Sequence, residues 1–285
     1  MFRGKPVLAF VHIRKTGGST VDMILRQSFG AGHCRIRLGK ERAANPVAAA
    51  AEIRRCRWIY WKMKCLSGHG ITPHSDLDSI SKQLRFFTFL REPVTRCASD
   101  YQFRVVRGGL KQPFHEWVRT EYAGNQQTLK IAGRPDADAA IEILDSKVGF
   151  VGLLERFDES LVLLQRWAQP MGLDIRYQAK NVSGNSSIKT QLLTNPESLS
   201  LLREVNQEDL KLYRYVNEEI YPKRVSSFEG DLANAVEDFQ RTNQPPAVYP
   251  RQIGSVLLRE MIYKPLAPLL RNSENTTVPQ MRAAS

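Results

Sequence analysis

The residue types best suited to hold a phosphate group are concentrated in one short segment, residues 12–20, which reads HIRKTGGST. Lys15 offers a positive charge with three N–H donors, and the paired glycines let the backbone turn closely around an anion. The residues expected to hold the phosphate are Arg14, Lys15, Thr16, Gly17, Gly18, Ser19 and Thr20. The segment therefore predicts a site that binds phosphate.

The elements on either side of this segment would aim it at an anion. The apolar run Val7–Val11 has the length of a buried strand, and apolar residues recur at helical spacing from Val21 onward. Ser19 or Thr20 is expected to cap that helix. A turn between a strand and a helix N-terminus presents free backbone N–H groups and the positive end of the helix dipole to a phosphate.

The loop differs from the two most familiar phosphate loops. The ATP- and GTP-binding pattern G-x-x-x-x-G-K-[ST] places its lysine after the second glycine, whereas Lys15 precedes both Gly17 and Gly18. The dinucleotide pattern G-x-G-x-x-G is also missing from the sequence. We therefore expect a phosphate loop of another kind.

A second anion-binding motif lies in residues 85–101, which read RFFTFLREPVTRCASDY. Phe86–Leu90 has the character of a buried strand, and Pro93 suits the first turn of a following helix. Arg91 at the end of the strand and Ser99 two turns into the helix can converge on one phosphate monoester, because a guanidinium fork and a hydroxyl suit its oxygens.

The two motifs together resemble those of the sulfotransferases that use 3′-phosphoadenosine-5′-phosphosulfate (PAPS), in the carbohydrate branch that includes heparan and chondroitin sulfotransferases. The loop is similar to the family's 5′-phosphosulfate loop, although family members often carry proline where this chain has Arg14. Residues 90–101 match the 3′-phosphate motif L-R-[DE]-P-x-x-R-x-x-S-x-Y. Further similar stretches extend the resemblance over roughly residues 7–221, and they lie at residues 125–133, 148–164, 180–183 and 208–220.

The resemblance implies an activity and a fold. It implies transfer of the sulfuryl group from PAPS to a hydroxyl, with a carbohydrate favoured as the acceptor and adenosine 3′,5′-bisphosphate as the product. It also implies a P-loop-like fold of three α/β/α layers around a parallel sheet, and no metal. Lys15 would stabilise charge on the oxygen that bridges sulfur and the 5′-phosphate during an in-line displacement.

A base for the acceptor hydroxyl is expected at His69. Residues 58–66 are rich in β-forming types and predict a strand, which would place His69 just beyond its carboxyl end, where open α/β sheets bind ligands. A histidine ordinarily titrates near neutral pH, which suits a general base. The segment also resembles the family's Gly-His segment, which holds the proposed base. The alternatives left open are His74, Glu92 and Glu155.

The order of the elements predicts an α/β fold with a parallel sheet, because apolar strand patterns alternate with helical ones. The strands are expected at residues 7–12, 58–66, 85–90 and 148–153. The domain assignment is a sulfotransferase domain over 1–222, a helical extension over 223–271 and a disordered tail over 272–285. In the extension, residues 255–271 form a basic amphipathic segment broken at Pro265. This segment could pair subunits into a homo-oligomer or touch a membrane surface, but docking on the core is favoured.

Composition narrows the function classes. The 285 residues carry a net charge of +12, which suits a polyanionic donor, whereas no zinc-finger or RNA-binding signature supports a nucleic-acid partner. The four cysteines are irregularly spaced, so free thiols are expected rather than a disulfide framework. No apolar run is long enough to span a bilayer, which together with the resemblance indicates a cytoplasmic, bacterial enzyme without a transmembrane segment.

Three other functions remain open. A P-loop-type kinase of a small molecule or nucleotide would use a similar cradle, although the position of Lys15 and the Arg91/Ser99 pair disfavour it. A tyrosine or small-metabolite sulfotransferase would differ only in its acceptor. A binding protein that keeps the fold without catalysis is disfavoured by the presence of both Lys15 and His69.

Overall fold

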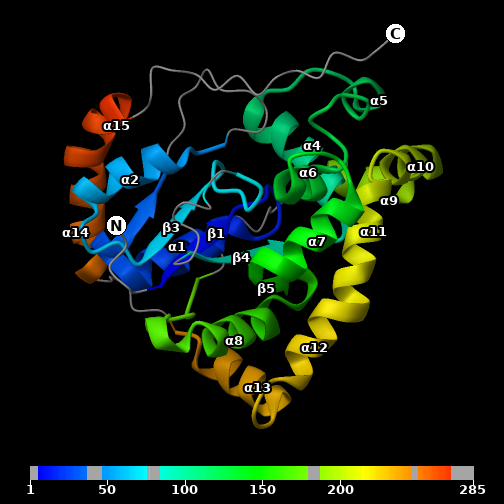
Figure 1. The fold of residues 1–285 in the computed structure, drawn as a ribbon. Helices are drawn as coiled ribbons and strands as arrows, with labels where there is room; N and C mark the ends of the chain where they lie inside the picture. The colour runs from blue at the N-terminus through cyan, green and yellow to red at the C-terminus, as the bar shows by residue number, and fades with distance from the viewer. Residues whose placement is uncertain are drawn as a thin grey trace.

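The computed structural model describes residues 6–36, 47–75, 77, 84–178, 187–244 and 250–270. The chain is an α/β protein built on one five-stranded sheet, in the order β2-β3-β1-β4-β5, with every neighbouring pair parallel. Helices surround the sheet (Figure 1). The strands are β1 (Val7–Val11), β2 (His33–Arg35), β3 (Cys65–Gly68), β4 (Leu84–Leu90) and β5 (Val148–Leu153).

The central strand β1 explains why the first apolar run forms a strand. All five of its residues are buried, and Leu8 pairs with Cys65 of β3 on one side and with Arg85 of β4 on the other. A strand in the middle of a parallel sheet is covered on both faces, so it is apolar throughout rather than alternating. The carboxyl ends of β1, β3 and β4 therefore lie side by side at one edge of the sheet.

The helices around the sheet divide into two groups. Those before and between the strands are α1 (Gly18–Phe29), the short η1 (Gly30–Gly32), α2 (Ala50–Ile59), α4 (Pro93–Gly108), α5 (Phe114–Trp117), α6 (Gln126–Ala132) and α7 (Ala137–Lys147). Those after β5 are η2 (Leu154–Arg156), α8 (Phe157–Trp167), η3 (Gln169–Met171), α9 (Ser187–Thr194), α10 (Pro196–Glu204), α11 (Gln207–Tyr215), η4 (Val216–Ile220), α12 (Tyr221–Ser226), α13 (Leu232–Thr242), α14 (Pro250–Leu257), η5 (Leu258–Tyr263) and α15 (Lys264–Leu270).

A second hydrophobic cluster lies apart from the main core. It forms where α4 packs against α5, α9 and α10, and its largest buried side chains are Tyr101 and Trp117. Their rings lie 5.1 Å apart between centroids. Trp117 therefore serves packing. The segment between α4 and α6 is anchored to the protein by this cluster.

One strand assignment made from the sequence is wrong, and one strand was missed. The strand expected at 58–66 begins only at Cys65, because α2 continues to Ile59 and the chain then turns. The helix is favoured because Ile53, Cys56 and Tyr60 are buried at helical spacing, while Trp58 faces solvent. Strand β2 was not predicted, because three residues of mixed character carry no strand pattern.

The C-terminal helices pack on the α/β body, which confirms the docking expected for this segment. Helix α13 contacts α8, and α14 contacts η1 and α1. Pro265 does not break the segment as expected, since η5 is a π-helical turn that continues into α15 with Pro265 at the first turn. The tail expected at 272–285 lies outside the described residues.

All four cysteines are buried and free, as the sequence predicts. They are distributed over different elements, with Cys34 on β2, Cys56 on α2, Cys65 on β3 and Cys97 on α4. Within the described ranges, no helix is both long and apolar enough to cross a lipid bilayer.

Candidate active site

The phosphate loop connects β1 to α1 through two residues with left-handed backbone. Gly17 has φ 82° and is the N-cap of α1, and Lys15 has φ 66°, an uncommon value for a residue with a side chain. The capping expected of Ser19 or Thr20 is wrong, because both lie inside the first turn and no side chain caps the helix. The N–H groups of Thr20 and Val21 donate to the Gly17 carbonyl at 3.0 and 3.3 Å, so Thr20 does not offer its N–H to a phosphate as expected. The N–H groups of Gly18 and Ser19 precede them and face the site where an anion would bind a helix N-terminus.

The side chains of the loop have different tasks. Thr16 is fully buried and its hydroxyl donates to the Ile13 carbonyl at 3.1 Å, so it holds the shape of the loop. The exposed Arg14 donates to Asp100 of α4, with Nη2 and Oδ1 3.1 Å apart. Arg14 therefore ties the loop to α4 through a carboxylate.

Lys15 is half-buried at the mouth of the loop. Its ammonium lies over the ring of Phe103, 4.5 Å from the centroid. Burial lowers the pKa of Lys15, and the nearby Arg91 guanidinium lowers it further. A lysine held by an aromatic ring keeps its charge available for an anionic ligand.

Arg91 brings the second motif to the loop. It follows β4, and its Nη1 donates to the Lys15 carbonyl at 3.2 Å. Pro93 begins α4 as predicted, and Ser99 lies half-buried two turns along it. The guanidinium of Arg91 and the ammonium of Lys15 thus lie in one region, although no contact joins Ser99 to either of them.

The two alternative carboxylates are engaged in structural bonds. Glu92 caps α4 by accepting from the N–H groups of Val94 and Thr95 at 3.0 and 2.7 Å. Glu155 accepts from the Glu92 N–H at 2.9 Å and from the Tyr213 hydroxyl at 2.9 Å. Both carboxylates face the Arg91 side of the site, and their oxygens are used in holding it.

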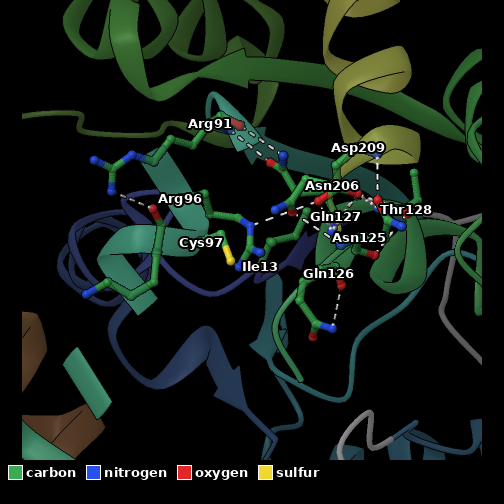
Figure 2. Close-up of polar contacts among 12 residues, drawn as sticks. Ile13, Arg91, Arg96, Cys97, Asn125, Gln126, Gln127, Thr128, Asn206 and Asp209 are labelled. Atoms are coloured by element: carbon green, nitrogen blue, oxygen red, sulfur yellow. Dashed lines mark hydrogen bonds and ion pairs between the residues drawn. The ribbon is translucent and has the colours of Figure 1, made fainter. Parts of the chain in front are cut away.

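The backbone of Arg91 is held by a single buried side chain, Gln127. The Arg91 N–H donates to Gln127 Oε1 at 3.0 Å, and Gln127 Nε2 donates to the Arg91 carbonyl at 2.9 Å (Figure 2). The side-chain amide of Gln127 therefore satisfies both the backbone N–H and the backbone carbonyl of Arg91. This arrangement fixes the point from which the Arg91 guanidinium extends.

Asp209 of α11 holds Gln127 in turn. It accepts from the backbone N–H groups of Gln127 and Thr128 and from the Thr128 hydroxyl, at distances of 2.7–3.1 Å. These are the first N–H groups of α6, where a carboxylate is also favoured by the helix dipole. Asp209 thus anchors the helix that carries Gln127, and Figure 2 shows both residues in one polar network.

Arg96 lies fully buried beside this network. Its Nε is 4.0 Å from Asp209 Oδ2, and its Nη2 donates to the Ala123 carbonyl at 2.8 Å. Burial raises the pKa of Asp209, while the Arg96 guanidinium and the N–H donors oppose that shift. The arginine and the carboxylate, both fully buried, therefore balance each other's charge.

His69 lies directly after β3, as expected, although that strand begins later than the sequence indicates. Its Nδ1 is 3.2 Å from the His12 carbonyl, and since a carbonyl only accepts, Nδ1 carries the proton. The neutral ring therefore has its lone pair on Nε2. His69 is exposed, yet the surrounding protein atoms and, to a lesser degree, the Lys130 ammonium together lower its pKa to about 4.

Lys130 of α6 is the buried cation of this region. Its Nζ donates to the His69 carbonyl, and burial lowers its pKa to about 7. At the next residue of α6, the Ile131 carbonyl lies 3.1 Å from His74 Nδ1. The two candidate histidines thus bracket the end of α6, and only His69 is beside the loop.

His12 joins the base region to the phosphate loop. Its ring lies 4.4 Å from that of His69 between centroids, and a Cβ at Gly18 would overlap it. Only glycine therefore fits at the second glycine position. Beyond His12 lies a buried polar cluster in which the Ser67 hydroxyl donates to Asp22 at 2.5 Å and meets His33 Nε2 at 2.8 Å.

The buried His12 and His33 make the free energy of unfolding depend on pH. Burial lowers the pKa of His12 to about 3 and that of His33 to about 4, from 6.5 in the unfolded chain. The unfolded state therefore binds protons first as the pH falls. We expect the free energy of unfolding to fall between about pH 6.5 and 4, by up to about 1.4 kcal/mol per pH unit for each histidine.

Urea unfolding at pH 7, 6 and 5 measures this dependence. Replacing His33 with glutamine should reduce the slope, whereas the same change at the exposed His115 should leave it unaltered. An unfolding free energy equal at pH 7 and pH 5 would contradict the expectation.

Comparison with models of known protein families gives no match, and neither does comparison with curated protein sequences. Sequence reasoning missed the roles of Gln127, Lys130 and Asp209. Gln127 lies in the segment 125–133, which resembles a sulfotransferase segment, so that likeness could have indicated it. Nothing in the sequence distinguishes the buried Lys130 from a solvated lysine on a helix.

Proposed function

We propose that this protein is a sulfotransferase that moves the sulfuryl group of PAPS to a hydroxyl, with a carbohydrate as the favoured acceptor. The observation that carries the proposal is the contact of Arg91 with the Lys15 carbonyl at 3.2 Å, since it joins two cationic motifs 76 residues apart. A donor with phosphates at its 5′ and 3′ positions requires two such sites. The parallel sheet is compatible with the three-layer, P-loop-like fold that we propose for the chain.

The 5′-phosphosulfate would lie at the N-terminus of α1 and the 3′-phosphate at Arg91 and Ser99. As the acceptor oxygen attacks sulfur, Nε2 of His69 would take its proton. The bond between sulfur and the 5′-phosphate oxygen would break, and adenosine 3′,5′-bisphosphate would leave. Lys15 would stabilise the charge that develops on that oxygen, as preorganised donors do in group transfer.

The orientation of His69 supports its role as the base. A base must be neutral before it takes a proton, and His69 is neutral at pH 7. Its pKa of about 4 makes it a weaker base than an ordinary histidine, so its position is what supports the role. Its protonated Nδ1 is directed to the His12 carbonyl, so the lone pair on Nε2 is the one available to an acceptor. His74 Nδ1 meets the Ile131 carbonyl, and its Nε2 lies against Gly133 at the end of α6, so His74 is the weaker candidate.

Nucleotide binding tests the proposal. Adenosine 3′,5′-bisphosphate at 100 times its dissociation constant should stabilise the protein by about 2.7 kcal/mol, seen as a higher melting temperature, whereas ATP should not. Arg91→Ala should abolish the preference for adenosine 3′,5′-bisphosphate over adenosine 5′-monophosphate. Arg134→Ala, which removes an exposed arginine paired with Asp136, is the matched control.

Transfer of labelled sulfate from PAPS to glycans, tyrosine peptides and small alcohols then identifies the acceptor class. Stabilisation by ATP in place of adenosine 3′,5′-bisphosphate would instead support the kinase. Donor binding without transfer to any acceptor would support a binding protein.

A further inference from the structure

Large apolar side chains are exposed on two neighbouring segments, the end of α2 and the C-terminal helices. Trp58 is 87% exposed, Trp61 71% and Met261 71%. The other exposed members on these segments are Ile253, Val256, Leu257, Ile262 and Leu266. Single exposed apolar residues are ordinary, but a gathering of this kind marks an interaction surface.

The C-terminal helices use only one side for packing on the body. Ser255, Tyr263 and Ala267 are buried on that side. The other side carries Leu257 and Met261 one helical turn apart, where a helix at the surface of a globular protein normally carries polar residues. The packing of these helices on the body therefore leaves an apolar side uncovered by the described residues.

The two exposed segments meet at one contact. The rings of Tyr60 and Tyr263 pack edge to face, 5.5 Å apart between centroids. Trp61 follows Tyr60 in the sequence, and Ile262 precedes Tyr263. Exposed apolar residues therefore lie next to the contact on both segments. Figure 1 shows α2 beside α15 at the same side of the molecule. We call the set Trp58, Trp61, Leu257, Met261 and Ile262 the tryptophan face.

The charge around the tryptophan face is positive. Among residues 50–64, the exposed charged side chains are Arg54, Lys62 and Lys64, and all three are basic, whereas the one acidic residue, Glu52, is buried. The ammonium of Lys62 lies 4.3 Å from the centroid of the Trp61 ring. In the C-terminal helices, the acidic Glu260 is paired with Lys264.

This charge decides between two occupants. A second copy of the chain docked by the same face would bring these basic residues opposite one another, since a two-fold interface is self-complementary. An anionic surface would instead be attracted to them. Tryptophan rings prefer the headgroup region of a bilayer, and lysine and arginine stems lie along apolar surface with their charges at the headgroups.

We propose that the tryptophan face binds the surface of a membrane rich in anionic lipid, with Trp58 and Trp61 in the headgroup region. The site of the phosphate loop takes no part in this binding, so the inference is independent of the proposed sulfotransferase activity. The membrane would hold the enzyme at its surface rather than be crossed by it.

Sedimentation of the full chain with vesicles tests the inference. Vesicles of phosphatidylcholine mixed with phosphatidylglycerol should bind the protein and shift its tryptophan fluorescence to the blue, whereas pure phosphatidylcholine should bind it at least tenfold more weakly. The double variant W58S/W61S should lose at least tenfold in affinity for the mixed vesicles. Val106→Ser, which removes an exposed apolar residue of α4, is the matched control and should bind as the wild type does.

Three results would overturn the inference. They are no binding of the wild type to mixed vesicles, equal binding by the double variant, and a wild-type dimer that the double variant dissociates while neither binds vesicles. Unchanged melting temperatures establish that both variants are folded. None of these measurements uses sulfate transfer, so their outcome does not depend on the proposed activity.

Discussion

Replacing Lys15 with alanine should lower the turnover of sulfate transfer by about 10²–10³-fold, the range found when one donor to a transition state is removed. The ammonium is half-buried at the loop and lies over the ring of Phe103, 4.5 Å from its centroid. Initial rates with saturating PAPS measure the effect. Because the change removes charge stabilisation in the transition state, the loss should appear in kcat.

Lys62→Ala is the matched control for this change. Lys62 also lies over an aromatic ring, that of Trp61, but it is remote in sequence from the loop and exposed. Its removal should leave turnover within about twofold of the wild type, because a solvated surface charge contributes little. Sulfate transfer at the wild-type rate by Lys15→Ala would show that the loop is not the catalytic site.

Replacing Asp209 with alanine should cost about 3–5 kcal/mol of stability, the range for breaking a buried ion pair by removing one partner. The change leaves Arg96 without its carboxylate and leaves the first N–H groups of α6 without an acceptor. Urea unfolding followed by circular dichroism measures the loss.

Two further variants keep this expectation testable. Asp209→Asn preserves shape and part of the hydrogen bonding, so it should fold and lose less stability while weakening nucleotide binding through Gln127 and Arg91. Asp238→Ala breaks an exposed pair with Arg241 and should cost no more than about 1 kcal/mol. A stability of Asp209→Ala equal to that of Asp238→Ala would contradict the role given to the network.

Elements whose pattern comes from burial on both faces could be predicted well from the sequence. The apolar runs of β1, β4 and β5 are too short for typical helices and therefore predict buried strands. Pro93 marks the start of α4 as expected. The run around Trp58 was misjudged because its β-forming residue types outweighed a helical spacing visible only in Ile53, Cys56 and Tyr60. Whether such a segment forms a helix or a strand is determined by its tertiary contacts.

The site divides in the same way. Lys15, Arg91 and His69 each come after a segment that the sequence predicts to be a strand, so their positions at strand ends could be predicted. The clamp of Gln127 on Arg91 joins residues 36 apart, and the bonds of Asp209 reach across 81 or more. These contacts depend on how α6 and α11 pack on each other, and no local pattern reports that. The helix cap was missed because left-handed Gly17 leaves Ser19 and Thr20 inside the first turn.

The four buried thiols give the protein a set of internal reporters. Burial raises the pKa of Cys34 and Cys65, and it raises that of Cys97 to about 11. Since only the thiolate reacts, alkylation of the folded chain should wait for each segment to open. Cys97 belongs to the cluster under α4, while the other three belong to the main core. The order in which a thiol reagent modifies them therefore reports whether the two regions open together or one before the other.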